Sequence, residues 1–336
     1  MSGRELVLLG QNAKEGDYPF FVHFGSGDGE VNCGGSLIAA DMVLTAGHCK
    51  VETGKTKAYV GRHKLKNDEN EEIFGIVNVV RHPEFKDEKG VMGVQSATHD
   101  QMIVFLDGTS EMDVVRINQE PAIPNNGTDL DVVGFGRYVP DDPTGSNNIL
   151  GKVEETAPIL QETGGQVYLD SDVCKDTLDK WNFTGETISD DMFCVQEKAS
   201  GACGGDSGGP VLLKQNGEPD LLVGIVSGGK TGNCIWVATR NQDPAYAQHY
   251  SQYPRRIGTC SRVSYTSNWI SEQVCINSMD PPSYFNCDGI THAPTSTSSP
   301  TASTFSPTPS PASGTTVGLG VSPILGVLLV YTVLSK

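Results

Sequence analysis

Basic residues are scarce in this sequence. Its 336 residues include 24 Lys and Arg against 41 Asp and Glu, which gives a formal net charge of −17 at pH 7. Phosphate groups would repel such a chain, so nucleic acid is excluded as a partner. We interpret the acidity as that of a soluble surface.

The nine cysteines lack the short Cys-x-x-Cys spacing of zinc sites, and only Cys49 lies next to a histidine. A disulfide framework is the better interpretation, and disulfides imply an oxidising compartment. The first ten residues nevertheless lack a secretory signal, because the apolar run at residues 6–9 is too short for one. We therefore expect a leader that is missing from this sequence.

The sequence also lacks helix-length segments that alternate with strands, which disfavours an α/β fold. Short apolar segments such as residues 21–24 and 36–38 lie between glycine-containing turns and predict β-strands. At about 150 residues per domain, the length suggests two structural units. Pro, Asn and Gly cluster at residues 121–127, and we place the connection between the two units there.

One glycine-rich segment has the composition of a nucleophile site. Residues 204–210 read Gly-Gly-Asp-Ser-Gly-Gly-Pro, which exposes the hydroxyl of Ser207 and frees backbone N–H groups to turn toward one point. Acyl transfer needs such a nucleophile and such donors for the oxyanion. Alone, this run is more often a turn. Two partners lie upstream, however: His48, and Asp100 before an apolar segment, in the order His, Asp, Ser.

Together these segments resemble the chymotrypsin-type serine peptidases over residues 7–275. The motifs that carry the resemblance are Cys-Gly-Gly-Ser-Leu-Ile at 33–38, Leu-Thr-Ala-Gly-His-Cys at 44–49, His-Asp-Gln-Met-Ile-Val-Phe-Leu at 99–106, Gly-Phe-Gly at 134–136, the Ser207 segment, Gly-Ile-Val-Ser-Gly-Gly at 224–229 and Val-Ser-Tyr-Thr-Ser-Asn-Trp-Ile at 263–270. The resemblance implies an all-β fold of two six-stranded antiparallel β-barrels, about 7–120 and about 121–275, with a short C-terminal helix. It also implies a serine endopeptidase that acts on proteins or peptides without a metal or organic cofactor.

The resemblance assigns roles to the catalytic residues. Ser207 would attack the peptide carbonyl, and His48 would take its proton and pass it to the leaving amine. Asp100 would orient His48, and Ser227 would donate a hydrogen bond to Asp100. The N–H groups of Gly205 and Ser207 would form the oxyanion hole.

In this family, cleavage after a basic residue frees an N-terminus that pairs with the carboxylate before the nucleophile. Here Val7 and Asp206 would form this activation ion pair, which makes the protein a zymogen. The basic residue upstream is Arg4, and cleavage after it would leave two residues too many. Cleavage after Leu6 would need a different activator.

The resemblance places Gly201 and Ala202 at the floor of the primary specificity pocket. The walls would be formed by Gly228, Gly229 and about Gly258. Family members that cut after Arg or Lys need a carboxylate at the floor, because a buried unpaired cation costs several kcal/mol. Gly201 provides none, and Gly228 replaces a large aromatic residue. The sequence therefore predicts cleavage after bulky apolar or aromatic residues, unless a carboxylate reaches in from residues 235–257.

The resemblance also implies the disulfides Cys33–Cys49, Cys174–Cys194 and Cys203–Cys234. Beyond them, Cys275 and Cys287 flank a turn rich in proline, and we expect them to be bonded. The alternative is a bond between Cys260 and Cys275 that leaves Cys287 unpaired. Sequence alone does not decide between the two.

The C-terminal region predicts attachment to a cell surface. A Cys-containing extension at residues 276–292 leads to a Ser/Thr/Pro-rich stalk at 293–316, which has no apolar periodicity for a core. The apolar tail at 317–334 would span roughly 27 Å as a helix, slightly short of a bilayer core. We expect a GPI-attachment signal, with a transmembrane helix as the alternative. In a secreted chain, the sequons at Asn126 and Asn182 would be available for N-glycosylation.

Two further alternatives accompany these predictions. The loop at residues 61–74 has the length of a calcium loop in some relatives, but Arg62 occupies the position of a ligand, so a solvated acidic loop is favoured. The competing function is a catalytically silent homologue that binds or inhibits another protein, suggested by the irregular N-terminus and the missing aromatic wall. The intact His48, Asp100 and Ser207 favour the extracellular, surface-tethered peptidase.

Overall fold

The computed structural model of the protein describes residues 10–26, 33–66, 69–89, 95–138, 155–180, 188–197, 201–229 and 257–289. The chain divides into two units, residues 1–293 and 294–336, and all the described residues belong to the first. The predicted stalk and apolar tail therefore lie outside the described residues. In the described part of the chain, no helix has the length and apolar character needed to cross a bilayer.

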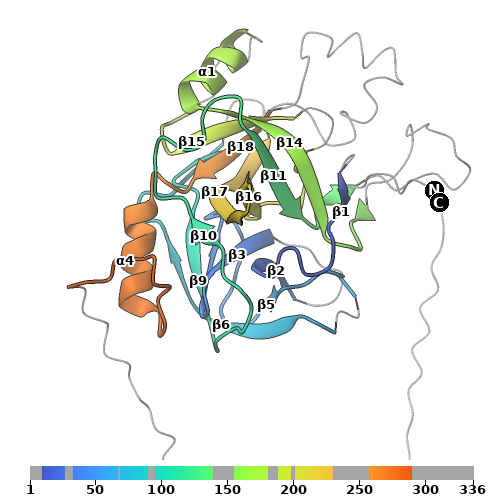
Figure 1. The fold of residues 1–336 in the computed structure, drawn as a ribbon, viewed down its shortest axis with the longest axis vertical. Helices are drawn as coiled ribbons and strands as arrows, with labels where there is room; N and C mark the ends of the chain where they lie inside the picture. The colour runs from blue at the N-terminus through green and yellow to red at the C-terminus, as the bar shows by residue number, and fades with distance from the viewer. Residues whose placement is uncertain are drawn as a thin grey trace, which may run out of the picture. The chain divides into compact units, whose positions relative to one another are not determined.

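The first β-barrel is closed by six antiparallel strands, which pair in the order β2-β3-β4-β9-β6-β5 (Figure 1). These strands are β2 (Phe21–Gly25), β3 (Cys33–Ala39), β4 (Met42–Thr45), β5 (Lys57–Val60), β6 (Glu72–Arg81) and β9 (Met102–Leu106). Every residue of β2, β3 and β4 is buried, which explains why these segments are short and largely apolar. Closure leaves this sheet without an unpaired edge.

The second β-barrel is built in the same way from the strand order β14-β11-β16-β17-β18-β15, and pairing of β14 with β15 closes it. Its strands are β11 (Asp129–Gly134), β14 (Gln161–Leu169), β15 (Met192–Gln196), β16 (Pro210–Gln215), β17 (Glu218–Gly229) and β18 (Ile257–Arg262). The predicted pair of six-stranded antiparallel barrels is confirmed.

Two short strands from the N-terminal part of the chain pair with the second barrel. Strand β1 (Gln11–Asn12) pairs antiparallel with β14, and β10 (Arg116–Ile117) pairs parallel with β17. Both fall within the range expected for the first barrel, so the two halves of the sequence are interleaved at these points. Two two-stranded antiparallel sheets complete the described strands: β7 (Lys86–Lys89) with β8 (Gln95–Thr98), and β12 (Arg137–Tyr138) with β13 (Glu155–Thr156).

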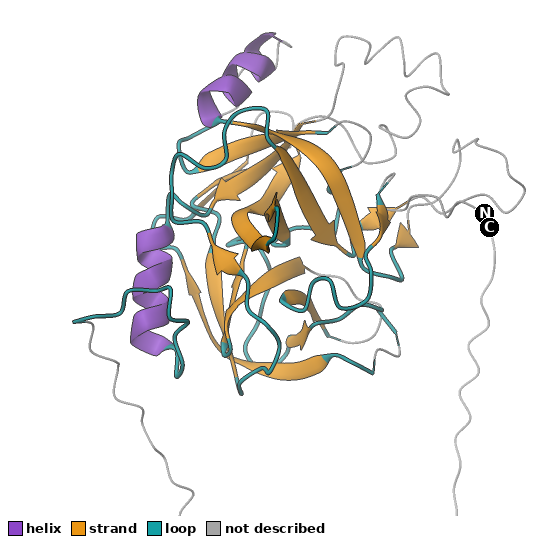
Figure 2. Ribbon diagram, viewed as in Figure 1, coloured by secondary structure: helices purple, strands orange, loops and turns teal. Residues whose placement is uncertain are grey.

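Among the described residues, the helices α1 and α4 lie on the outside of the strands (Figure 2). The predicted C-terminal helix is α4 (Ser267–Asn277), which buries Ile270 and Val274 one turn apart. The other helix, α1 (Ser171–Lys180), contains Cys174 and was not predicted from the sequence.

The extension after α4 is fastened to the first barrel. The disulfide Cys275–Cys287 closes it, and Cys260 is a buried free thiol, which settles the alternative left open by the sequence. The hydroxyl of Ser278 donates to Asp41 Oδ1 (2.7 Å), and the N–H of Met279 donates to Asp41 Oδ2 (2.9 Å). These bonds satisfy the buried carboxylate of Asp41.

Candidate active site

His48 lies in the turn that follows β4, at the end of the first barrel. The disulfide Cys33–Cys49 fastens this turn to β3. The backbone N–H of His48 donates to Asp100 Oδ1 (2.8 Å), and its ring Nδ1 donates to Asp100 Oδ2 (2.8 Å). Because Nδ1 carries the proton toward the carboxylate, Nε2 is left as the acceptor, which is the arrangement of a general base.

Asp100 is fully buried two residues before β9. Its carboxylate accepts a third hydrogen bond from the hydroxyl of Ser227 in β17, so donors from both barrels hold it. The next residue, Gln101, is equally buried and donates to Ser261 Oγ (3.0 Å) and Arg262 O (3.1 Å) in β18. Gln101 therefore fixes the turn of Asp100 against the second barrel, a role that sequence reasoning did not identify.

The pKa of His48 reflects two opposing effects. Burial favours the neutral imidazole and lowers the pKa, but the hydrogen bond and the charge of Asp100, with a contribution from Asp87, outweigh burial and raise it above its ordinary value. The imidazolium that forms during proton transfer is therefore stabilised beside Asp100.

The Ser207 loop lies where the two barrels meet. The N–H of Gly34 in β3 donates to Ser207 O (2.8 Å), and the N–H of Gly208 donates to Val226 O in β17 (2.8 Å). A Cβ atom on Gly208 would lie 2.2 Å from Thr45 Oγ1, and its φ of +79° also requires glycine. The Ser207 loop is adjacent to the turn of His48, since Cys49 Sγ lies 3.8 Å from Ser207 O, although no hydrogen bond joins the Ser207 hydroxyl to the imidazole of His48, both described residues. Such bonds are often long or poorly aligned without substrate.

The residues before Ser207 are held by the buried carboxylate of Asp206. It accepts hydrogen bonds from the N–H groups of Gly136 and Cys203, both at 2.7 Å. Gly205 has a φ of +104°, and neither its N–H group nor that of Ser207 donates to any residue in the described ranges. These two N–H groups are therefore available to a negatively charged oxygen.

Comparison with known proteins agrees with this geometry. The family model described as Trypsin matches residues 7–257. The chain belongs to the trypsin family of serine peptidases. It is 26% identical to "Trypsin 5G1" of Aedes aegypti over 81% of this chain and 85% of the relative, and 31% identical to "Trypsin theta" of Drosophila melanogaster over 66% and 76%. It is 29% identical to "Serine protease 1" of Homo sapiens over 73% of this chain and 85% of that protein. The protein is therefore a serine-type endopeptidase that acts on proteins or peptides.

A carboxyl group lies beside Gly201, the residue predicted to form the floor of the specificity pocket. A Cβ atom added to Gly201 would lie 1.8 Å from Cδ of Glu197 and about as close to both carboxyl oxygens, at 2.1 and 2.2 Å. Glu197 is buried directly after β15. The carboxyl group of Glu197 thus occupies the space beside Gly201, and the preference for apolar or aromatic substrate residues stays a prediction.

The loop at residues 61–74 is organised by a buried arginine. Arg62 is 1% exposed, pairs with the carboxylate of Glu71, and lies 3.5 Å from the ring centroid of Tyr59. Its Nη1 also lies 3.0 Å from His23 Nδ1. The prediction of a solvated acidic loop was wrong at Glu71, because the guanidinium draws this carboxylate into the protein.

Several predicted site residues lie outside the described part of the chain. They are Val7 of the activation ion pair, the sequon residue Asn182, and Cys234. The predicted partner of Cys234, Cys203, is disulfide-bonded, and the predicted disulfide Cys174–Cys194 is present. Asn126, the other sequon residue, is exposed, and its Oδ1 accepts from the N–H of Asp170 (2.6 Å).

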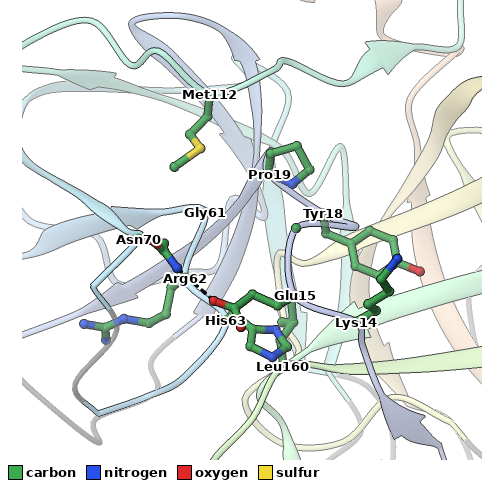
Figure 3. A pocket seen from close by; sticks show the side chains of 11 residues that line it. Lys14, Glu15, Tyr18, Pro19, Gly61, Arg62, His63, Asn70, Met112 and Leu160 are labelled. Atoms are coloured by element: carbon green, nitrogen blue, oxygen red, sulfur yellow. Dashed lines mark hydrogen bonds between the residues drawn. The ribbon is translucent and has the colours of Figure 1, made fainter.

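A separate cavity of about 220 Å³ lies between the N-terminal segment and the loop that follows β5 (Figure 3). Tyr18 and Met112 are among its lining residues, and a hydrogen bond from Asn70 Nδ2 to Glu15 Oε1 (2.8 Å) crosses one side. Its lining contains none of the predicted catalytic or pocket residues, so this cavity is distinct from the candidate active site.

Proposed function

We propose that this peptidase hydrolyses peptide bonds through a triad of His48, Asp100 and Ser207. His48 Nε2 takes the proton of the Ser207 hydroxyl as oxygen attacks the substrate carbonyl. The same nitrogen then gives the proton to the leaving amine, and an acyl-enzyme remains. The observation that carries the proposal is the double hydrogen bond of the Asp100 carboxylate to the main chain and ring of His48, next to the Ser207 loop.

The oxyanion of the tetrahedral intermediate is bound by the N–H groups of Gly205 and Ser207 in this proposal. Their freedom from other hydrogen bonds among the described residues supports that role. Water then attacks the acyl group, with His48 as base, and releases the product acid. The residue Ser227, which donates to Asp100, also starts the strand edge along which substrate backbone can dock.

The remaining proposals concern activation and location. Asp206 accepts the ammonium of a freed N-terminus, for which Val7 is the candidate, and this pairing converts the zymogen into the enzyme. The disulfides fit an extracellular protein, as is expected for this family. The stalk and apolar tail, through a lipid anchor or a transmembrane helix, would hold the enzyme at the cell surface, and Asn126 and Asn182 would carry glycans.

Peptide hydrolysis by three proteins tests the triad. The processed wild-type protein should cleave a peptide library, whereas Ser207→Ala and His48→Ala should each lose at least roughly 1,000-fold in kcat. Circular dichroism and urea unfolding of each variant serve as the folding control. A folded wild-type protein that cleaves nothing after processing would favour the silent binding module. Full activity in Ser207→Ala would exclude the proposed nucleophile.

A further inference from the structure

Both residues that flank Asp100 in the chain are tied to the second barrel. On one side, the side chain of Gln101 donates to two residues of β18. On the other side, the backbone N–H of His99 donates to Asp191 Oδ2. The C=O of His99 also accepts from the N–H of Gln101 (2.7 Å), so Asp100 lies at the centre of a tight three-residue turn. The place of the Asp100 carboxylate therefore depends on both ends of this turn.

His99 has a backbone conformation that needs support from its surroundings. Its φ of +50° lies in the left-handed region, and it is the one residue other than glycine with a positive φ in the described part of the chain. Residues that carry a side chain adopt this conformation uncommonly, and neighbouring groups have to hold them there. The ring of His99 stacks on that of His82, with 4.7 Å between the centroids, and Tyr265 packs edge-on at 5.7 Å. Its Nε2 lies 3.3 Å from Glu84 Oε2.

Asp191 is a buried residue, 1% exposed, directly before β15. Its C=O accepts from the N–H of Arg262 at the end of β18 (2.7 Å), which fixes its main chain to the second barrel. Its carboxylate accepts from the hydroxyl of Ser189 as well as from the N–H of His99, and Oδ2 lies 3.9 Å from His99 Nδ1. A buried carboxylate holds its donors firmly, because a lost bond would leave its charge unsatisfied. Asp191 therefore fastens the turn of His99 to the second barrel.

We propose that Asp191 is a positioning residue, which holds the His99 turn so that the carboxylate of Asp100 reaches both the main chain and the ring of His48. The proposal rests on the function proposed above, since it concerns the acid of the same triad. His48 follows a strand of the first barrel and Ser207 belongs to the second, so a tie at Asp100 also fixes the base relative to the nucleophile. Loss of this tie should slow proton transfer and leave substrate binding nearly unchanged.

The test compares two substitutions that remove the same charge. Asp191→Ala removes the acceptor of the His99 N–H, whereas Asp191→Asn keeps an oxygen acceptor in the same place. The full, processed chain is used, and kcat is divided by the fraction that a fluorophosphonate labels at completion. Asp191→Ala should lower kcat at least about tenfold with KM within about twofold, and Asp191→Asn should keep kcat within about threefold. The matched control is Asp190→Ala, at the exposed neighbouring residue, which should equal wild type.

The pH profile distinguishes positioning from a general loss of stability. Burial lowers the pKa of His48, and the hydrogen bond and charge of Asp100 raise it above its ordinary value. If Asp191→Ala releases Asp100 from His48, the acid limb of kcat/KM should move to lower pH, whereas Asp191→Asn should keep the wild-type midpoint. A substitution that only destabilised the fold would reduce the labelled fraction and leave the midpoint where it is.

The outcomes separate this proposal from the triad. If wild type labels with fluorophosphonate but Asp191→Ala keeps its kcat and its midpoint, the role of Asp191 alone is overturned. Equal losses in Asp191→Ala and Asp191→Asn also overturn it, because they would report a lost charge. Absence of labelling in wild type overturns the triad and this proposal with it.

A second pair of variants decides if Asp191→Ala does not fold. His99→Asn and His99→Val both lack the ring, but Asn tolerates a left-handed φ and the β-branched Val does not. His99→Val should therefore have a kcat at least about tenfold below that of His99→Asn. Equal values would overturn the proposal, since they would show that the turn at His99 does not control Asp100.

Discussion

Asp131 on β11 offers a stability prediction with a defined sign. Its partial burial is the main cause of a raised pKa, and the charges of Glu162, Asp220 and Asp129 add to it against an opposing effect of Lys214. The result is a pKa of about 6 instead of 3.8. Because the pKa of Asp131 is raised in the folded state, its carboxyl group binds a proton more tightly in the folded protein than in the unfolded chain. The stability that this contributes is complete below pH 3.8 and is lost as pH rises through about 6. The variant Asp131→Asn stays neutral at every pH and should avoid this loss.

The magnitude follows from the size of the shift. A pKa shift of Asp131 from 3.8 to about 6 corresponds to a loss of at most about 3 kcal/mol in the free energy of unfolding at pH 8. Since the side chain is only partly buried and water screens its charge, we expect Asp131→Asn to raise the free energy of unfolding by about 1 kcal/mol. Urea unfolding at pH 8.0 and 4.0 measures this, with the exposed Glu218→Gln as control. The gain should nearly vanish at pH 4.0. A variant less stable than wild type at pH 8.0, or a gain that is equal at both pH values, would refute the reasoning.

Three more predictions follow from the active site and the extension. Asp100→Asn should lower kcat by roughly 10³–10⁴-fold with a smaller change in KM, because an amide cannot hold His48 in the tautomer that it needs; a loss below tenfold in steady-state kinetics would speak against it. The acid limb of kcat/KM against pH should have its midpoint above 6.5, since the pKa of His48 is raised and the base must be neutral; a midpoint below 6.5 would contradict the effect of Asp100. Replacing both Cys275 and Cys287 with Ala opens a loop of 12 residues and should lower the free energy of unfolding by about 3 kcal/mol in urea titrations. An unchanged free energy of unfolding would instead show that the hydrogen bonds to Asp41 hold the extension.

The sequence predicted the two barrels because the patterns that mark their strands and motifs are local. Short apolar segments such as β4 and β9 are bounded by turn residues, and the motifs around His48 and Ser207 occur in an order that suits only one fold. Closure of the barrels, and the crossing of β1 and β10 to the second barrel, depend on pairing between distant segments. No local pattern contains that information.

Helix α1 was missed because its composition is mostly polar. Of its ten residues, Ser171, Cys174 and Leu178 are buried, so Leu178 is the only large apolar side chain on its buried face. Tertiary packing and the disulfide to Cys194 determine that this segment is helical. A polar segment of this kind is indistinguishable from a loop when only periodicity is considered.

The carboxyl group beside Gly201 could not be foreseen from the sequence, for a different reason. The sequence correctly placed no charge at residue 201, but the direction of the Glu197 side chain depends on the turn after β15 and on space at two glycines. Gly258 is far from Glu197 along the chain and becomes its neighbour only when β15 pairs with β18. The absence of a side chain at residue 201 does not by itself reveal which group lies beside it.

The central claim is that one serine hydroxyl, activated by His48 and Asp100, performs the hydrolysis. Its most direct test is the site of covalent modification when the processed protein reacts with a fluorophosphonate and is digested for tandem mass spectrometry. The account predicts a single adduct on Ser207, formed much more slowly in His48→Ala. An adduct on another residue, or labelling of Ser207 at the same rate in His48→Ala, would contradict it.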